Sequence, residues 1–154
     1  MEKPKYRRVL LKISGEALAG DKHFGLDFGV IGQVTDVIKE CVEAGVQMGI
    51  VIGGGNFWRG VKNGEGYIER TRADHMGMLA TVINSLALQD CLARLGVPVR
   101  VMSSVDMPRV ADGYSSRGAQ AALEAGEVVI FAGGSGLPFF STDTAAAQVG
   151  GPTV

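Results

Sequence analysis

The chain of 154 residues is long enough for one domain that buries a hydrophobic core without disulfides or a structural metal. Charged residues make up 20% of the chain and the net charge is -1, which argues against a protein that holds nucleic acid by bulk charge. Glycine is the outlier, with 23 residues that stand in separate clusters. Glycine clusters between apolar runs are typical of loops in which the backbone closely approaches a ligand.

Cysteine usage and the amino-terminal segment predict a cytoplasmic protein without a membrane span. Cys41 and Cys91 lie within apolar, helix-like patterns, which predicts two buried free thiols in a reducing compartment. The apolar run at residues 9–11 is interrupted by Lys12 and is too short for a signal sequence. No apolar stretch is expected to reach the length of a membrane helix.

Two kinds of segment alternate along the chain: short runs of consecutive apolar residues, and longer segments whose apolar residues recur at helical spacing. In chain order we expect a strand at 9–13, a loop at 14–16, a helix at 30–42, a strand at 46–52, a helix at 70–95, a strand at 99–102, a helix at 119–125, a strand at 128–132 and a helix that starts near 145. The strands are continuously apolar, which is typical of an α/β fold with a mainly parallel sheet sandwiched by helices.

The expected helix at 70–95 is apolar on several sides. Its apolar residues fall on more than one face: Met76, Leu79, Ile83 and Leu86 on one, and Met78, Val82 and Leu92 on others. A helix with this pattern is normally covered on several sides. In a domain of this size a second subunit is the expected cover, so we expect a homo-oligomer.

Three loops with glycine follow expected strands, at 14–16, 53–60 and 133–143. Ligands bind at the carboxyl ends of strands in open parallel sheets, so these loops are expected to form one site. Neither standard phosphate motif fits, because Asp21 occupies the lysine position of a P-loop and Phe139 replaces the third glycine of a dinucleotide fingerprint. Phosphate binding would therefore need another architecture.

Four features in or near these loops suit phosphoryl transfer, and three of them have a plainer alternative. Lys12 either reaches solvent along the sheet edge or directs its ammonium group at phosphate oxygens. Glycines 53–55 form either a simple turn or an anion cradle, and Arg59 would reach the same anion with its guanidinium fork. Asp74 either compensates a helix dipole or accepts hydroxyl hydrogen bonds, as from a ribose. Phosphoryl transfer needs mainly positioning and charge neutralisation.

Four longer motifs stand in order along the chain: LKISGEAL at 11–18, VIGGGNFWRG at 51–60, ADHMGMLAT at 73–81 and GLPFFSTD at 136–143. Together they resemble the bacterial uridylate kinases, a family within the amino-acid kinase superfamily. The resemblance covers residues 7–148. It implies an amino-acid kinase-like fold and the conversion of UMP and ATP into UDP and ADP with Mg²⁺, a step of pyrimidine nucleotide biosynthesis.

The resemblance also implies roles for particular residues. The ATP side would use Lys12, Ile13, Ser14, Gly15, Gly55 and Arg59. The UMP side would use Gly54, Asp74, Ser135, Gly136, Leu137, Pro138, Phe139, Phe140, Ser141 and Thr142. Lys12, Arg59 and Asp143 would be catalytic, with Asp143 orienting the lysine, and no side chain would be a metal ligand. From the residues alone, Phe139 and Phe140 are core residues or part of a base pocket.

Family members are typically hexamers built from dimers, and many respond to GTP as activator and UTP as inhibitor. The position of a loop linked to GTP activation corresponds here to Gly20, Asp21, Lys22, His23, Phe24 and Gly25. We expect residues 1–147 to be the UMP-binding portion and 148–154 to be an atypical tail, because family chains continue into an ATP-binding half. The alternatives are a non-catalytic fragment that binds UMP or joins subunits, and a related kinase for an amino acid or carbamate.

Overall fold

A parallel five-stranded sheet forms the centre of the protein. The computed structural model describes residues 7–59 and 66–134. The strands are β1 (Arg8–Ile13), β2 (Gln47–Ile52), β3 (Val99–Ser103), β4 (Asp112–Gly113) and β5 (Val128–Ala132). They lie in the order β1-β2-β5-β3-β4, and all neighbouring pairs are parallel. The α/β class with a mainly parallel sheet is therefore confirmed.

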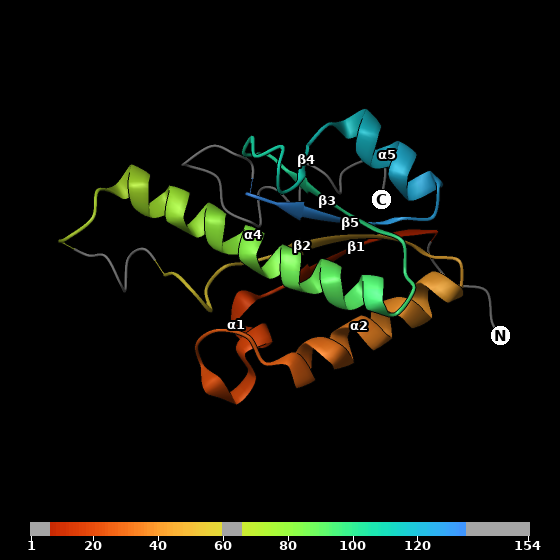
Figure 1. The fold of residues 1–154 in the computed structure, drawn as a ribbon, viewed down its shortest axis with the longest axis horizontal. Coiled ribbons are helices and arrows are strands. Elements are labelled where there is room, and N and C mark those ends of the chain that lie inside the picture. Colours follow the sequence, from red (N-terminus) through yellow and green to blue (C-terminus); the bar gives the residue numbers. More distant parts are fainter. Residues whose placement is uncertain (1–6, 60–65, 135–154) are drawn as a thin grey trace.

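Helices cover both faces of this sheet (Figure 1). They are α1 (Gly15–Ala19), the short 3-10 helix η1 (Gly20–Lys22), α2 (Phe28–Glu43), α4 (Arg70–Arg94) and α5 (Ser116–Glu124). The larger cluster of buried side chains joins α2 and α4 to one face of the sheet, and a smaller cluster joins α5 to the other face. The amino-terminal turns of α4 extend past the sheet (Figure 1).

Strand β2 shows why the strands are apolar without interruption. Ile50 and Ile52 belong to the cluster beneath α2 and α4, whereas Val51 belongs to the cluster beneath α5. Successive side chains of a strand point to opposite faces, and here both faces are covered by helices. An alternating apolar and polar pattern would leave polar groups in one of the two clusters.

Polar caps and glycines fix the ends of the helices. The Asp27 side chain accepts hydrogen bonds from the amides of Gly29 and Val30 and begins α2. Gly45 and Gly96, at φ of 91° and 78°, follow the ends of α2 and α4, in the left-handed conformation that favours glycine. The helix ends predicted at these two glycines are confirmed.

Three local expectations from the sequence differ from the structure. Residues 14–16 are not a loop: Ser14 caps α1, which begins at Gly15, because its side chain accepts a hydrogen bond from the Ala17 amide. Helix α5 begins at Ser116 rather than at residue 119, since Ser115 supplies its cap. The two-residue strand β4 was not expected.

Helix α4 also corrects the expectation that no stretch reaches the length of a membrane helix. Within 7–59 and 66–134, α4 is the one helix long and apolar enough to cross a bilayer by length and composition. The core helix of a soluble protein passes the same test, and α4 packs against α2 and the sheet.

The two cysteines were expected to be buried free thiols. Cys41 and Cys91 are free, but both are only partly buried.

Candidate functional site

The loops at the carboxyl ends of the strands come together at one edge of the sheet. Ile13 of β1 pairs with Ile52 of β2, and Gly53 continues this ladder by donating its amide hydrogen bond to the Ile13 carbonyl at 2.9 Å. Across the sheet, the amide of Ser104 donates to the carbonyl of Ala132 at 3.1 Å. The convergence predicted for the loops after β1 and β2 and for the start of the loop after β5 is therefore present.

The glycine loop, residues 53–56, is held by close packing. None of its three glycines has a left-handed backbone. A methyl group added to Gly54 would lie 2.7 Å from Cβ of Ala80 on α4, and one added to Gly55 would overlap the Glu16 carboxylate. Packing alone therefore favours glycine at residue 54. A side chain at residue 55 would displace the flexible Glu16 carboxylate, and one at residue 53 would lie 3.3 Å from the Gly15 amide nitrogen.

Lys12 is the penultimate residue of β1 and is exposed beside this loop. Its strand neighbours Leu11 and Ile13 pack into the cluster beneath α2 and α4, so alternation places Lys12 on the α5 side of the sheet. Its register partner is Val51, two residues before the first glycine of the loop. The Ile13 side chain is buried in the core, so only its backbone can contribute to a site.

Arg59 forms an ion pair that sequence reasoning did not include in the site. Its Nη2 lies 3.2 Å from Oε1 of Glu16, and both side chains are 46% exposed. Its Nε donates a hydrogen bond to the Gly55 carbonyl at 3.3 Å. An ion pair this exposed contributes less than about 1 kcal/mol to stability, so an incoming anion can compete for the guanidinium at low cost.

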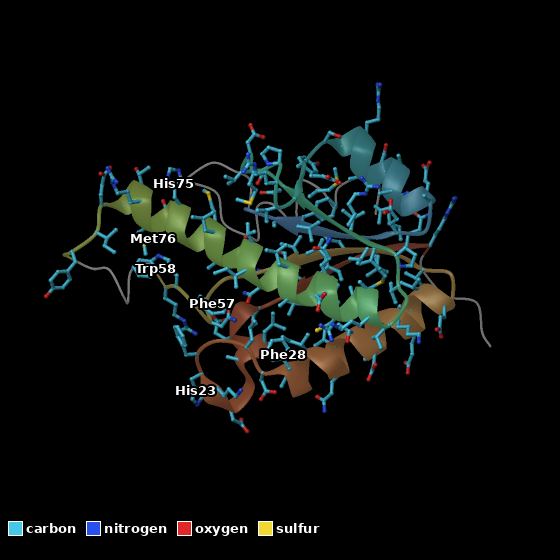
Figure 2. All side chains as sticks on the ribbon, in the orientation of Figure 1. His23, Phe28, Phe57, Trp58, His75 and Met76 are labelled. Carbon is cyan, nitrogen blue, oxygen red and sulfur yellow. The ribbon has the colours of Figure 1, made fainter. Side chains whose placement is uncertain are left out.

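A cleft of about 540 Å³ opens beside this ion pair. Its lining residues are Glu16, His23, Phe24, Gly55, Phe57, Trp58 and Arg59. The rings of Phe24 and Phe57 meet edge to face at 5.7 Å. Figure 2 shows Phe57 and Trp58 between His23 and the amino-terminal half of α4. Of the six residues expected to form a regulatory loop, His23 and Phe24 therefore share a cleft with Gly55 and Arg59.

Asp74 stands in the second turn of α4. Its Oδ2 is buried and has no hydrogen-bond partner among the described residues, and Nε of Arg70 lies 3.7 Å away. The indole nitrogen of Trp58 donates to the Ala73 carbonyl at 2.9 Å and ties this turn to the segment after the glycine loop. A buried acceptor without a donor is costly, so the site favours a ligand hydroxyl at this oxygen.

The comparisons with known proteins agree with this geometry. Residues 7–151 match the model of the amino acid kinase family. The chain belongs to the amino acid kinase family. It is 40% identical to a UMP kinase from Bacillus anthracis, with a TM-score of 0.88, and the match covers 94% of this chain and 59% of that one. It is 35% identical to a UMP kinase from Ureaplasma parvum, with a TM-score of 0.86, and the match covers 94% of this chain and 65% of that one.

The chain therefore spans less than two thirds of the length of either UMP kinase. A third structure, the isopentenyl phosphate kinase of T. acidophilum in a product complex, shares the fold at 16% identity and a TM-score of 0.56, with 79% of this chain and 53% of that chain covered. The expected site residues at 135–142 and Asp143, like the tail at 148–154, lie outside the described residues.

Sequence reasoning missed the contacts of three buried polar side chains. Asn56 and Asn84 bond to one another, and Oγ1 of Thr81 accepts a hydrogen bond from the Gly133 amide at 2.8 Å. Thr81 thus connects α4 to the segment that leads into residues 135–142. Polar residues among the apolar positions of 70–95 were the available signal.

The described part of the chain offers no metal site built from a cluster of protein side chains. Residues 7–59 and 66–134 contain no group of three or more His, Cys, Asp or Glu side chains that could hold an ion. Mg²⁺ is often bound largely through substrate phosphates, with few protein ligands. A Mg²⁺ ion held mainly by nucleotide phosphates and water would need no such group.

Proposed function

We propose that the protein is the acceptor-binding portion of a UMP kinase, which transfers the γ-phosphoryl group of ATP to UMP. The observation that carries this proposal is the convergence of Lys12, the glycine loop and Arg59 at one edge of the sheet. The choice of UMP as acceptor is supported by the identities of 40% and 35% to two UMP kinases. The same likeness supports a cytoplasmic role in pyrimidine nucleotide biosynthesis.

In the proposed reaction, a phosphate oxygen of UMP attacks the γ-phosphorus of ATP, and ADP leaves. Lys12 and Arg59 neutralise charge on the phosphates, which lowers the barrier because the transition state spreads charge over oxygens. Ser14, Gly15 and Gly55 border the ATP phosphates, and Gly54 borders the UMP phosphate. No residue of the chain forms a covalent intermediate.

The rest of the proposed UMP site comes from the described and the undescribed parts of the chain. Oδ2 of Asp74, which has no hydrogen-bond partner among the described residues, accepts a ribose hydroxyl. Residues 135–142 complete the site, and Asp143 orients Lys12; both assignments rest on the resemblance in sequence motifs. Mg²⁺ bound to the ATP phosphates would supply further neutralisation of their charge. GTP and UTP are proposed effectors, and the position of His23 and Phe24 in the cleft beside Arg59 supports a regulatory role for residues 20–25.

A second function, assembly without catalysis, is favoured by one observation on α4. Met76, Leu79 and Ile83 are 38%, 48% and 47% exposed and follow one stripe of the helix. An exposed apolar stripe of this kind is typical of a protein interface. It supports a homo-oligomer, which in the family is a hexamer, and it suits a fragment that binds UMP or joins subunits.

The deciding experiment offers UMP, CMP and glutamate separately to the purified chain with labelled ATP and Mg²⁺. We expect UDP from UMP alone, and transfer slowed by about 100-fold or more in the Lys12→Met variant. Lys39→Met is the matched control, because Lys39 is a lysine of α2 that pairs with Glu43. A chain without transfer whose melting temperature rises with UMP would establish the binding fragment. Transfer to glutamate, or no response to any acceptor, would overturn the proposal.

A further inference from the structure

We propose that the buried amide pair of Asn56 and Asn84 is a positioning device that fixes the glycine loop against α4. The inference rests on the proposed function and deepens it, because the glycine loop carries the phosphate-binding groups and α4 carries Asp74. The pair would thereby set the distance between the two substrates. Neither residue contacts the reacting atoms in this proposal.

The two amides form a closed, reciprocal pair. Nδ2 of Asn56 donates to Oδ1 of Asn84 at 3.0 Å, and Nδ2 of Asn84 donates to Oδ1 of Asn56 at 2.8 Å. The residues are 1% and 0% exposed, respectively. Their side-chain hydrogen bonds are therefore removed from competition with water, and breaking one leaves a buried group unsatisfied.

The remaining donors of the pair reach two loops. The second N–H of Asn84 donates to the Gly53 carbonyl at 2.8 Å, and the second N–H of Asn56 donates to the Gly25 carbonyl at 2.8 Å. The Gly25 amide returns a hydrogen bond to the Asn56 carbonyl at 3.0 Å. All four N–H groups of the pair are thus used, and they join the glycine loop, α4 and the loop that contains His23.

The location of the pair explains why its role is positional. Asn84 is ten residues from Asp74 on the same helix, about 15 Å along its axis. Its partner Asn56 directly follows the three glycines, three residues before Arg59. Apolar side chains would pack the same junction without fixing direction, whereas four hydrogen bonds hold the loop in one register relative to the helix.

Hydrogen exchange on the 154-residue chain tests the positioning role independently of catalysis. In Asn84→Leu we expect amides of residues 15–25 and 53–58 to exchange about tenfold faster or more, while those of β5 change less than about twofold. Ser85→Ala is the matched control: Ser85 is equally buried on α4, but its hydroxyl donates to the Thr81 carbonyl within the same helix, at 2.7 Å. It should leave both loops unchanged. Asn84→Ser replaces Asn84→Leu if the latter does not fold.

Two results would overturn the inference: unchanged exchange in both loops, or equal acceleration in the loops and in β5. If the unsubstituted chain transfers phosphate to UMP, Asn84→Ser should also lower kcat about tenfold, with less than about a threefold change in KM. The reason is that a displaced glycine loop would misalign the reacting phosphates, which raises the free energy of the transition state. An unchanged kcat would count against positioning. If the chain transfers nothing and its melting temperature does not respond to UMP, the proposed function fails, and the exchange pattern alone decides the role of the pair.

Discussion

Gly15 and Asn56 belong to different segments, yet a methyl group added to Gly15 would lie 2.7 Å from Oδ1 of Asn56. The amide nitrogen of Gly55 and the carbonyl oxygen of Gly53 would be as close, at 2.7 and 2.8 Å. Two of these three neighbours are backbone atoms, which cannot rotate away. The first turn of α1 and the glycine loop therefore have to move apart to admit any side chain at residue 15.

We expect Gly15→Ala to lower the free energy of unfolding by about 1–3 kcal/mol, the usual cost of forcing a group into a packed site. Urea denaturation of the two proteins measures the difference. Gly32→Ala is the control, because Gly32 lies within α2 and an added methyl group would meet nothing within 4 Å. That change should raise stability by about 0.5–1 kcal/mol. Equal effects of the two substitutions would contradict the close approach.

Gly54 and Ala80 form a second close contact, and it predicts a rescue. Gly54→Ala should destabilise the protein, because the new methyl group would lie 2.7 Å from Cβ of Ala80. Adding Ala80→Gly removes that contact, although the Gly77 carbonyl would still lie 3.0 Å away. We therefore expect partial recovery of the melting temperature in the double variant. If the double variant lost more free energy of unfolding than the two single variants lose together, this explanation would be refuted.

Lys12→Met should affect chemistry without affecting folding. The side chain is exposed, so we expect the free energy of unfolding to change by less than about 0.5 kcal/mol. Loss of a charge that stabilises the transition state should lower kcat for transfer to UMP by about 100-fold or more. Steady-state kinetics and urea denaturation of the same preparation separate the two effects. A parallel loss of stability would assign Lys12 a structural role.

Asp74→Asn tests Oδ2 of Asp74, the carboxylate oxygen that has no hydrogen-bond partner among the described residues. The substitution keeps the shape but replaces one acceptor with a donor, so a ribose hydroxyl loses its partner. We expect the Kd for UMP, measured by calorimetry, to rise about tenfold. Arg70→Gln removes the ion pair with Asp74 at an exposed guanidinium and should change the Kd by less than about threefold. Equal effects of both changes would attribute the result to the ion pair.

The exposed stripe of α4 predicts self-association that a charge can disrupt. Leu79→Lys should shift the sedimentation coefficient toward that of a monomer, because a lysine at the centre of an apolar interface loses its hydration. Val37→Lys is the control, since Val37 is an exposed apolar residue of α2 that lies outside the stripe. A monomeric parent protein, or equal effects of both substitutions, would remove the case for an interface on α4.

The sequence predicts those elements whose pattern is long or strictly apolar. Strand β5 matches its expected bounds of 128–132, and α4 ends one residue before the expected position. Both are dictated by local chemistry: a run of buried β-branched residues in β5, and the glycine that follows α4. Helix α1 has only five residues, too few to display a helical period, and the two residues of β4 carry no pattern.

The candidate site likewise has a part that the sequence predicts and a part that it does not. Lys12, the glycine loop and Arg59 stand in or beside expected strands, so their meeting follows from the rule for parallel sheets. The pairing of Asn56 with Asn84 does not follow, because 28 residues separate them and nothing in their spacing specifies a contact. The ion pair of Glu16 with Arg59 could not be predicted either, since it depends on the direction that α1 takes after Ser14.

The amino-terminal turns of α4 extend past the strand ends (Figure 1). Contacts along the helix hold it up to these turns, because Asn84 donates a hydrogen bond to the Gly53 carbonyl and Ala80 lies close to Gly54. The Ala73 carbonyl, next to Asp74, accepts a hydrogen bond from the Trp58 indole. The acceptor side of the site therefore cannot shift unless the segment at residues 53–58 shifts with it, so a change in either one would be transmitted to the other.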